Sequence, residues 1–271
     1  MMPQTPPPSV IAFDRVSLAF DEKVVLRGVS FVVPKGRTKI ILGASGSGKS
    51  TILKIIVGLL RADAGDVFVN GERINDLTEA QLMKVRGDLG LIFQEGALFD
   101  SLTVRENVGY KYYEETDMPL DDVDHRVVEV LSFIGLAQQV DKMPSELSGG
   151  QRRRVAIARA LAFKPGILLY DEATTGLDPI TAITVDDEIV KLRDLEGVTS
   201  IVVTHQLRDA FYVATKMAVR TSMGAVDIVD ATPEKIGETE FIMLKDGVIR
   251  FEGNADELRR SDDPYLKSFL S

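Results

Sequence analysis

The stretch Gly43-Ala-Ser-Gly-Ser-Gly48-Lys49-Ser50 indicates the fold class of this chain of 271 residues. It matches the phosphate-loop pattern G-x-x-x-x-G-K-[ST], in which small residues let backbone N–H groups turn toward phosphate oxygens. The apolar run Thr38–Leu42 precedes the loop, and Ser50–Leu60, whose apolar positions suit a helix, follows it. The order strand, glycine-rich loop, helix predicts a phosphate site, because the helix directs the positive end of its dipole at the loop.

The loop residues have distinct predicted contacts. Lys49 would neutralise the β and γ phosphates of a nucleotide, and Ser50 would offer its hydroxyl to Mg²⁺, which prefers oxygen ligands. The remaining contacts to the nucleotide are assigned to Gly43, Ser45, Gly46, Ser47, Gly48 and Thr51. The alternative is a Gly/Ser turn with an incidental Lys, and the flanking strand and helix disfavour it.

Two acidic residues follow a second buried strand. Ile167–Tyr170 is an apolar or aromatic run, Asp171 emerges at its carboxyl end, and Glu172 is one residue further. A phosphate loop needs such a carboxylate to order the metal, so we assign Asp171 to Mg²⁺ and Glu172 to polarising the attacking water. Two adjacent acids at a strand end are otherwise often just solvated.

The composition is that of a soluble globular protein. The chain has 32 Lys and Arg against 41 Asp and Glu, a net charge of −9, with 45% hydrophobic residues. A nucleic-acid binder would carry the opposite sign, so we expect no nucleic-acid partner, and Arg152-Arg153-Arg154 is interpreted as a solvated or acid-paired group. The absence of Cys excludes disulfides and thiolate metal sites. The apolar stretch Ile52–Leu60 contains Lys54 and is too short to span a bilayer.

Apolar runs alternate with helical patterns along the chain. Val10–Phe13, Val29–Val33, Leu89–Phe93 and Ser200–Thr204 are further expected strands, and Asp121–Ile134 and Arg152–Phe163 further expected helices. Val67–Val69 ends in Asn70-Gly71, a strong hairpin signal. We therefore expect an α/β fold with a mostly parallel sheet, an antiparallel layer in the N-terminal part, and a helical insertion at about 96–163.

A third motif carries a family resemblance. Leu147-Ser148-Gly149-Gly150-Gln151 precedes a helix and then the acid-capped strand, and it resembles the signature sequence of ATP-binding cassette (ABC) ATPases. The Ser148 hydroxyl and the Gly149 and Gly150 amides at a helix N-terminus suit a γ-phosphate, and Gln151 completes the motif. In that family the phosphate belongs to ATP on the other protomer, so the resemblance implies a homodimer with two ATP molecules at its interface.

The resemblance covers nearly the whole chain and implies a domain organisation. It is that of a P-loop NTPase with a RecA-like parallel-sheet core, an N-terminal antiparallel β subdomain and an inserted α-helical subdomain. We expect a flexible tail at residues 1–8, one ABC ATPase domain over 9–254 with the helical subdomain at about 96–163, and a helical C-terminal tail over 255–271.

Further site residues are implied by the resemblance. Gln94 matches the glutamine that touches the metal and the attacking water, and His205 the histidine that contacts the γ-phosphate. Asp178, in Thr175-Gly-Leu-Asp-Pro, matches the aspartate that couples the two sites across the dimer. Phe20 occupies the place where the family stacks an aromatic ring on adenine, although Phe13 is nearby and an aromatic in a β-rich segment is more often core.

Three segments remain outside the motifs. The resemblance implies that the segment after Gln94 forms a groove for a coupling helix of a membrane subunit, and Ala97, Leu98 and Phe99 would give it an apolar floor, with core packing as the alternative. Arg220–Glu240 is an insertion relative to the family pattern, and we expect a surface loop there, because long insertions cost little closure entropy. The apolar patch at Tyr265–Leu270 is a candidate contact for a partner or the dimer mate.

The branch of the family is indicated by two stretches, Gln94–Val108 and Asp171–Thr181, which look like those of the Mla/Mce phospholipid-transport ATPases. That resemblance implies ATP hydrolysis at the cytoplasmic face of the inner membrane, an integral-membrane permease and a periplasmic lipid-binding subunit of the Mce type. The ATPase of an amino-acid or metal-ion importer is the main alternative. A ribosome- or DNA-acting family member, or a nucleotide-gated module without turnover, is a weaker one, because the chain has one cassette and a complete set of site residues.

Overall fold

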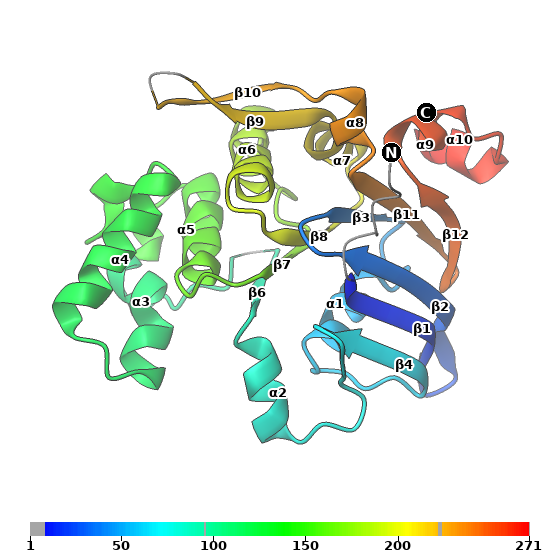
Figure 1. Cartoon of the computed structure of the whole chain (residues 1–271), viewed down its shortest axis with the longest axis horizontal. Helices are drawn as coiled ribbons and strands as arrows, with labels where there is room; N and C mark the ends of the chain where they lie inside the picture. Colours follow the sequence, from blue (N-terminus) through cyan, green and yellow to red (C-terminus); the bar gives the residue numbers. More distant parts are fainter. Residues whose placement is uncertain (1–8, 95, 222–223, 271) are drawn as a thin grey trace, which may run out of the picture.

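The central sheet has six strands in the order β12-β11-β3-β8-β7-β6 (Figure 1). The five strands from β11 to β6 are parallel, and β12 pairs antiparallel with β11. Their bounds are β3 Thr38–Leu42, β6 Leu89–Ile92, β7 Ile167–Asp171, β8 Thr199–Thr204, β11 Thr239–Lys245 and β12 Val248–Gly253. The computed structural model describes residues 9–94, 96–221 and 224–270, so the tail predicted for residues 1–8 lies outside the described residues.

Successive side chains of the central strands enter two different hydrophobic clusters. In β3, Ile40 and Leu42 belong to one cluster and Ile41 to the other, and Leu168 and Leu169 of β7 divide in the same way. Both faces of the sheet are therefore covered, which is why its strands are near-continuous apolar runs. This arrangement confirms the predicted parallel core.

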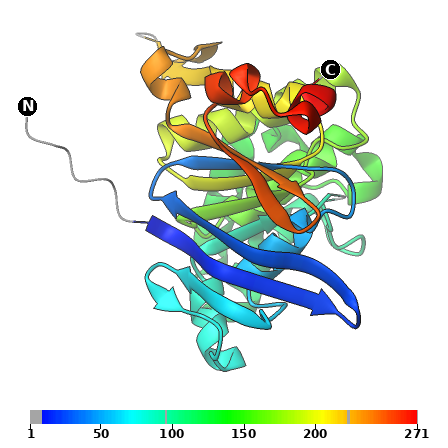
Figure 2. The same ribbon diagram turned by 90° about the vertical axis from the view of Figure 1, so that its right-hand side faces the viewer.

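An antiparallel sheet of four strands, in the order β2-β1-β4-β5, covers one face together with the first two helices (Figure 2). Its strands are β1 Ser9–Phe20, β2 Lys23–Pro34, β4 Ala64–Val69 and β5 Glu72–Arg73, and the helices are α1 Lys49–Ile56 and α2 Glu79–Arg86. The predicted hairpin at Asn70-Gly71 is confirmed, with both residues at positive φ between β4 and β5. Helix α1 ends earlier than the predicted Leu60, because the backbone turns left-handed at Gly58, with φ +69°.

The other face of the sheet is covered by the later helices. Three helices between β6 and β7 stand beside the sheet as a separate layer in Figure 1, and two short 3₁₀ turns connect them. The helices are α3 Val104–Glu115, α4 Leu120–Phe133 and α5 Gly149–Leu161. The 3₁₀ turns η1 Ala137–Gln139 and η2 Pro144–Glu146 both lie between α4 and α5. Helices α4 and α5 match the two helices predicted at 121–134 and 152–163, while α3 was not predicted. The division of the chain into a domain 9–254 and a tail stays a prediction.

Four more helices complete this face and the C-terminal end. Helix α6 Pro179–Leu195 and helix α7 Leu207–Thr215 pack on the sheet, and α9 Ala255–Arg260 and α10 Pro264–Leu270 follow β12. Leu266 of α10 is buried in the same cluster, so the C-terminal patch predicted as a contact surface is in part a core contact. Among the described residues, no helix combines the length and apolar composition needed to cross a bilayer.

The prediction of a surface loop at Arg220–Glu240 is wrong. The segment instead forms strand β10 Val226–Asp230, which pairs antiparallel with β9 Lys216–Arg220, and helix α8 Pro233–Ile236. We call β9, β10 and α8 the arm. Lys216 Nζ pairs with Asp230 Oδ1 at 2.6 Å, and Ala218 opposite Ile228 is buried toward α6.

The arm is fastened to the end of α6 by two buried residues. Arg193 donates from its guanidinium to the carbonyl oxygens of Val213 and Lys216, each at 2.6 Å. Asp194 accepts from the Ala218 amide at 2.9 Å and pairs with Lys235 Nζ at 2.9 Å. These contacts order a segment whose sequence, with Gly and Pro nearby, resembles a loop.

A buried carboxyl group between α6 and α7 yields a pH prediction. Burial, and then the charge of Asp209, raise the pKa of Asp186 to about 8. In the unfolded chain the Asp186 carboxyl ionises near pH 4, so between about pH 4 and 8 only the folded chain keeps this proton. The free energy of unfolding therefore falls as the pH rises from about 4 toward 8. Asp186→Asn should therefore become steadily more stable than the native chain between pH 5 and 8.5 in urea unfolding. Asp227→Asn, an exposed control, should show no such trend, and parallel stability curves for Asp186→Asn and the native chain would contradict the prediction.

Candidate functional site

The predicted phosphate loop lies between β3 and α1, at the carboxyl edge of the central sheet. Gly43 has φ +158°, and a Cβ there would lie 2.5 Å from the Leu244 carbonyl oxygen. Gly48, the residue before α1, has φ +102°, and a Cβ there would lie 2.9 Å from Leu26 Cδ2. Both positions need glycine, because left-handed backbone and close neighbours leave no room for a side chain.

Lys49 lies folded over this loop and is almost completely buried, at 4% exposure. Its ammonium donates to the carbonyl oxygens of Gly43 and Ala44 at 2.9 and 3.1 Å, and lies 3.4 Å from Glu172 Oε1. A buried ammonium needs such partners, since desolvation without them would neutralise it. The charge is thus held beside the loop amides, where an anion would bind.

Ser50 at the start of α1 and Asp171 at the end of β7 form a pair of oxygen ligands. The Ser50 hydroxyl donates to Asp171 Oδ1 at 2.7 Å. Burial raises the pKa of Asp171, against the hydrogen bond from Ser50. A hydroxyl and one carboxylate fit Mg²⁺, which takes oxygen ligands and completes its shell with water and phosphate. In the described part of the chain no three His, Cys, Asp or Glu side chains gather around a common point, so a fully protein-made metal cage is absent there.

Glu172 has an unusual backbone. Its φ is +53°, in the left-handed region that a non-glycine residue rarely adopts, and its amide donates to the Val203 carbonyl of β8 at 2.9 Å. The sequence pattern predicts Glu172 beyond the strand end but gives no sign of this turn. Strained backbone of this kind gathers at functional sites.

The carboxylate of Glu172 has three partners. Oε1 faces Lys49, and Oε2 accepts from the Thr175 hydroxyl at 2.7 Å and lies 2.5 Å from His205 Nδ1. Burial opposes ionisation, but the Thr175 hydrogen bond and the charges of Lys49 and His205 together bring the pKa of Glu172 below its usual value. The carboxylate is therefore ionised at neutral pH and able to accept a hydrogen bond from water.

His205 stands at the end of β8, directly before α7. The parallel register sets Leu42 beside Thr204 and Asp171 beside Val203, so the ends of β3, β7 and β8 meet at one edge. The structure thus brings together five predicted site residues from distant parts of the chain: Lys49, Ser50, Asp171, Glu172 and His205.

The signature residues form a separate group at the start of α5. The Ser148 hydroxyl accepts from the Gln151 amide at 3.3 Å, and Gln151 Oε1 accepts from the Ser148 amide at 2.9 Å, which is a capping box. Asp178 similarly caps α6 by accepting from the Ile180 and Thr181 amides. Within the described ranges no hydrogen bond or ion pair joins residues 148–151 to the phosphate loop.

Two other predicted site residues are not joined to the cluster. Phe20 ends β1 and is 46% exposed, with Asp21 at φ +52° after it, so its ring is available but touches no loop residue by an aromatic or polar contact in the described structure. Gln94 follows β6, is exposed, and has no hydrogen bond to Ser50 or Asp171 among the described residues.

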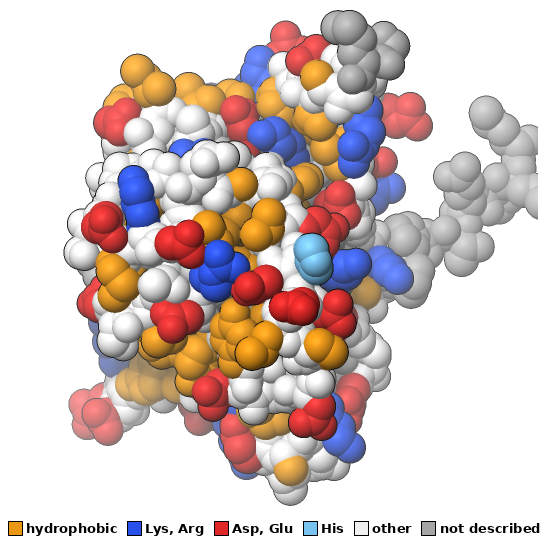
Figure 3. Space-filling model, turned by 90° about the vertical axis from the view of Figure 1, so that its left-hand side faces the viewer, with side chains coloured by type: hydrophobic (Ala, Val, Ile, Leu, Met, Phe, Trp, Pro, Cys, Tyr) orange, Lys and Arg blue, Asp and Glu red, His pale blue; other side chains and the backbone are white. Residues whose placement is uncertain are grey.

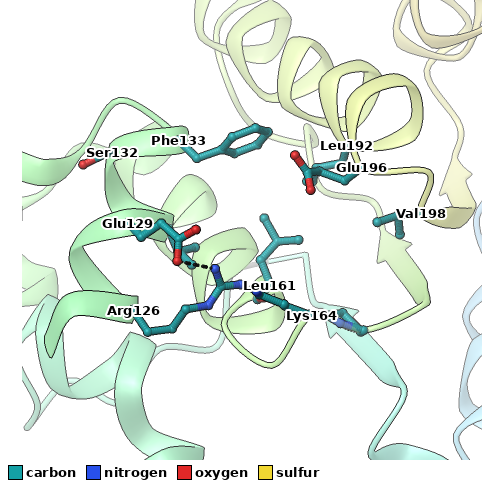
Figure 4. Close-up of a pocket in the computed structure, with 11 residues that line it drawn as sticks. Arg126, Glu129, Ser132, Phe133, Leu161, Lys164, Leu192, Glu196 and Val198 are labelled. Carbon is teal, nitrogen blue, oxygen red and sulfur yellow. Dashed lines mark hydrogen bonds and ion pairs between the residues drawn. The ribbon is translucent and has the colours of Figure 1, made fainter. Parts of the chain in front are cut away.

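Two cavities lie near these elements. One of about 490 Å³ borders the outer side of the loop between Val25, Ser45, Gly247 and Tyr265. Another, of about 660 Å³, lies between α4 and the ends of α5 and α6 (Figure 4), where Phe133 and Leu161 point inward and Arg126 pairs with Glu129. None of the residues that line the second cavity belongs to the phosphate loop or the Glu172 cluster.

The arginine run 152–154 also serves the fold, which the sequence interpretation did not include. Each of the three side chains donates to backbone carbonyls: Arg152 to Leu147, Arg153 to Ala173 and Thr175, and Arg154 to Ile134. Arg153 and Thr175 were not predicted as site residues. The only signal was that Thr175 stands three residues after Glu172, the spacing of a hydroxyl that can reach back in a turn.

Comparison with known proteins gives a consistent family. Residues 26–175 match the profile described as ABC transporter. Over 270 residues the chain is 38% identical to protein TRIGALACTOSYLDIACYLGLYCEROL 3, chloroplastic, of Arabidopsis thaliana, which covers 93% of this chain and 71% of that one. It is 32% identical to the intermembrane phospholipid transport system ATP-binding protein MlaF of Escherichia coli, over 94% of this chain and 86% of that one.

A methionine import ATP-binding protein, MetN 1 of Staphylococcus aureus, is similarly close, at 34% identity over 96% of this chain and 78% of its own. Among solved structures, a dimeric ATP-binding cassette in a post-hydrolysis state with bound ADP and Pi superposes with a TM-score of 0.73. Its identity is 32%, and the match covers 90% of this chain and 98% of that chain. These similarities confirm the predicted cassette fold.

The crowding at Gly150 yields a stability prediction. A Cβ at Gly150 would lie 2.0 Å from Thr181 Cγ2 of α6, whereas one at Gly149 would lie 3.3 Å from the flexible end of Leu177. Gly150→Ala should lower the free energy of unfolding by about 1–3 kcal/mol through overpacking, and Gly149→Ala by clearly less. Adding Thr181→Ser, which removes the obstructing methyl group, should restore most of the loss in thermal unfolding. Equal effects of the two alanines would contradict this geometry.

Proposed function

The chain belongs to the ABC transporter family of ATPases, and from this membership we propose that it drives phospholipid movement through a separate membrane permease. It is an ABC transporter ATPase subunit that binds and hydrolyses ATP. The observation that best supports a working active site is the contact of Glu172 with Lys49 and His205 beside the Ser50–Asp171 pair.

We assign each of these side chains a role in hydrolysis. Lys49 leaves the Gly43 and Ala44 carbonyls to neutralise the β and γ phosphates, and the amides of residues 45–51 hold the phosphate oxygens. Ser50 and Asp171, with Gln94, would hold Mg²⁺, which supplies charge stabilisation at the phosphates. Glu172 accepts a hydrogen bond from the attacking water, and His205 steadies the γ-phosphate oxygens.

A homodimer explains why the signature residues are apart from the loop. The amides of Gly149 and Gly150 and the Ser148 hydroxyl form an anion site at the start of α5 that the same chain's loop does not use. In the proposed dimer this group binds the ATP held by the partner's loop, and Asp178 at the start of α6 links the two sites. ATP binding then closes the dimer, and product release opens it.

The permease is proposed to contact the helical side of the molecule. Phe99 is 42% exposed, and its ring centroid lies 4.5 Å from that of Tyr110, itself 37% exposed, with the rings tilted by 37°. Leu98 packs on the core. Figure 3 shows this side of the molecule, with apolar side chains grouped among acidic and basic ones. An apolar floor with a charged border suits an amphipathic helix of a membrane subunit. Attachment through it would hold the ATPase at the cytoplasmic face of the inner membrane.

The phospholipid cargo is proposed from the relatives. MlaF of Escherichia coli is named for intermembrane phospholipid transport and the Arabidopsis thaliana relative for a glycolipid, while MetN 1 is named for methionine import at a comparable identity. Phospholipid transport is favoured because the stretches Gln94–Val108 and Asp171–Thr181 look like those of the Mla/Mce branch. A Mce-type periplasmic subunit is the corresponding expected partner.

Purification of the tagged chain from native membranes in mild detergent, followed by mass spectrometry, tests the cargo. Recovery of a polytopic permease with a Mce-type subunit would support phospholipid transport. Recovery of a permease with a solute receptor would assign the chain to an importer of amino acids or metal ions instead. Ribosomal or DNA-bound partners without a membrane protein would refute the transport proposal.

Lys49→Ala should weaken nucleotide binding by about 100-fold, because a charge-assisted hydrogen bond to phosphate contributes about 1.5–3 kcal/mol. The affinity for a fluorescent ATP analogue measures this loss. Lys54→Ala, on the next turn of α1 and exposed, is the matched control and should bind normally. An unchanged affinity in Lys49→Ala would rule out its phosphate role.

Glu172→Gln should keep ATP affinity and lower kcat by about 10²–10⁴, the usual contribution of a general base. Because hydrolysis no longer reopens the dimer, ATP should produce a stable dimer that size-exclusion chromatography detects. Near-normal turnover in this variant would show that another group activates the water.

A further inference from the structure

Thr175 contacts the carboxylate that the proposed function makes the general base. Its hydroxyl donates to Glu172 Oε2 at 2.7 Å, and its amide donates to the Glu172 carbonyl at 3.1 Å. The two residues therefore close a small turn, in which the Thr175 side chain holds the Glu172 side chain. Thr175 touches neither the phosphate loop nor Asp171 by any hydrogen bond in the described structure.

The other partners of this carboxylate have other proposed roles. Lys49 and His205 are both assigned to phosphate oxygens, so in the proposed mechanism they contact the nucleotide in place of Glu172 when it binds. Thr175 carries no charge, and the proposed function gives it no phosphate contact. Its hydrogen bond is then the contact that persists to hold Oε2 while Oε1 faces the water.

Glu172 has particular need of such a contact. Its left-handed backbone, at φ +53°, directs the side chain out of the strand and away from the regular pattern of β7. Its amide N–H donates to the Val203 carbonyl of β8 at 2.9 Å, and this hydrogen bond holds its main chain to the sheet. An acceptor misplaced by about 1 Å can cost about 100-fold in rate, so the aim of this side chain matters.

Thr175 is itself fixed from two directions. Arg153 of α5, which is 9% exposed, donates to the Thr175 carbonyl at 2.9 Å and to the Ala173 carbonyl at 3.0 Å. Gln206, next to His205, donates to the Thr175 hydroxyl at 3.4 Å. A hydroxyl that accepts from Gln206 directs its own hydrogen at Glu172. Through Arg153 this loop is tied to the helix that begins with the signature residues.

We propose that Thr175 is a positioning residue that aims the Glu172 carboxylate at the attacking water, and that Arg153 ties this aim to the signature helix. The inference rests on the proposed function of Glu172. Within one chain, Arg153 and Thr175 would connect helix α5, which binds the partner's ATP in the proposed dimer, to Glu172, which acts on the ATP bound by the same chain.

The test compares Thr175→Val, which keeps the shape but removes the hydroxyl, with Thr175→Ser, which keeps the hydroxyl. In the full-length protein Thr175→Val should lower kcat about 10- to 100-fold with the KM for ATP changed less than about twofold, and Thr175→Ser should recover most of kcat. ATP-induced dimer formation should be unchanged in both. Thr184→Val, whose hydroxyl bonds only to the Thr181 carbonyl at 2.7 Å in the described structure, is the matched control.

Normal kcat in Thr175→Val, or equal loss in Thr175→Val and Thr175→Ser, would overturn the inference. A fall in kcat that follows a fall in melting temperature would assign Thr175 a merely structural role and would also overturn it. If Thr175→Val does not fold, Thr175→Ala is judged by the same criteria.

A double variant separates this inference from the proposed function. If Glu172→Gln lowers kcat to a measurable residual rate, adding Thr175→Val should cause no further loss of that rate, because both changes act on one carboxylate. An additive loss would overturn the inference alone, whereas an active Glu172→Gln would remove the premise that Glu172 is the base.

Discussion

The buried charge of Lys49 is the constraint on which the site is built. An ammonium at 4% exposure is stable only beside acceptors, and two parts of the chain supply them: the Gly43 and Ala44 carbonyls of its own loop and the distant Glu172 carboxylate. The loop must therefore be rich in glycine to turn its carbonyls inward, and β3 and β7 must end at the same edge. The parallel sheet provides that edge, and the helices and antiparallel strands cover its two faces.

Much of this could be predicted from the sequence, for physical reasons. The strand, loop and helix around Lys49 form a local unit whose residue types leave few alternatives, and buried parallel strands are visible as apolar runs. Glu172 was predicted from its place one residue beyond an acid-capped strand, whereas His205 was found through the family resemblance. Its meeting with Glu172 depends on strand order and register, which no local pattern shows. The hairpin at Asn70-Gly71 was found because its turn requires residues that tolerate positive φ.

What could not be predicted depends on contacts between segments far apart in sequence. The positive φ of Glu172 accompanies the hydrogen bond from its amide to the Val203 carbonyl of β8, which the sequence near Glu172 does not show. The backbone contacts of the arginine run were not predicted, because the carbonyls that accept from Arg153 and Arg154 belong to other segments of the chain. The arm was taken for a loop because Arg193 and Asp194 on α6 help to hold it, and no pattern within residues 220–240 shows these contacts.

The way in which the arm is attached has a consequence for how this gene can change. The parallel strands β8, β3 and β11 pair with one another without any bond from β10, whose ladder runs only to β9. The connection from α7 to β11 can therefore gain or lose codons without shifting the register of the strands that carry the site. A reporter inserted between β9 and β10 would leave those strands in register, provided that the contacts of Arg193 and Asp194 with the arm persist.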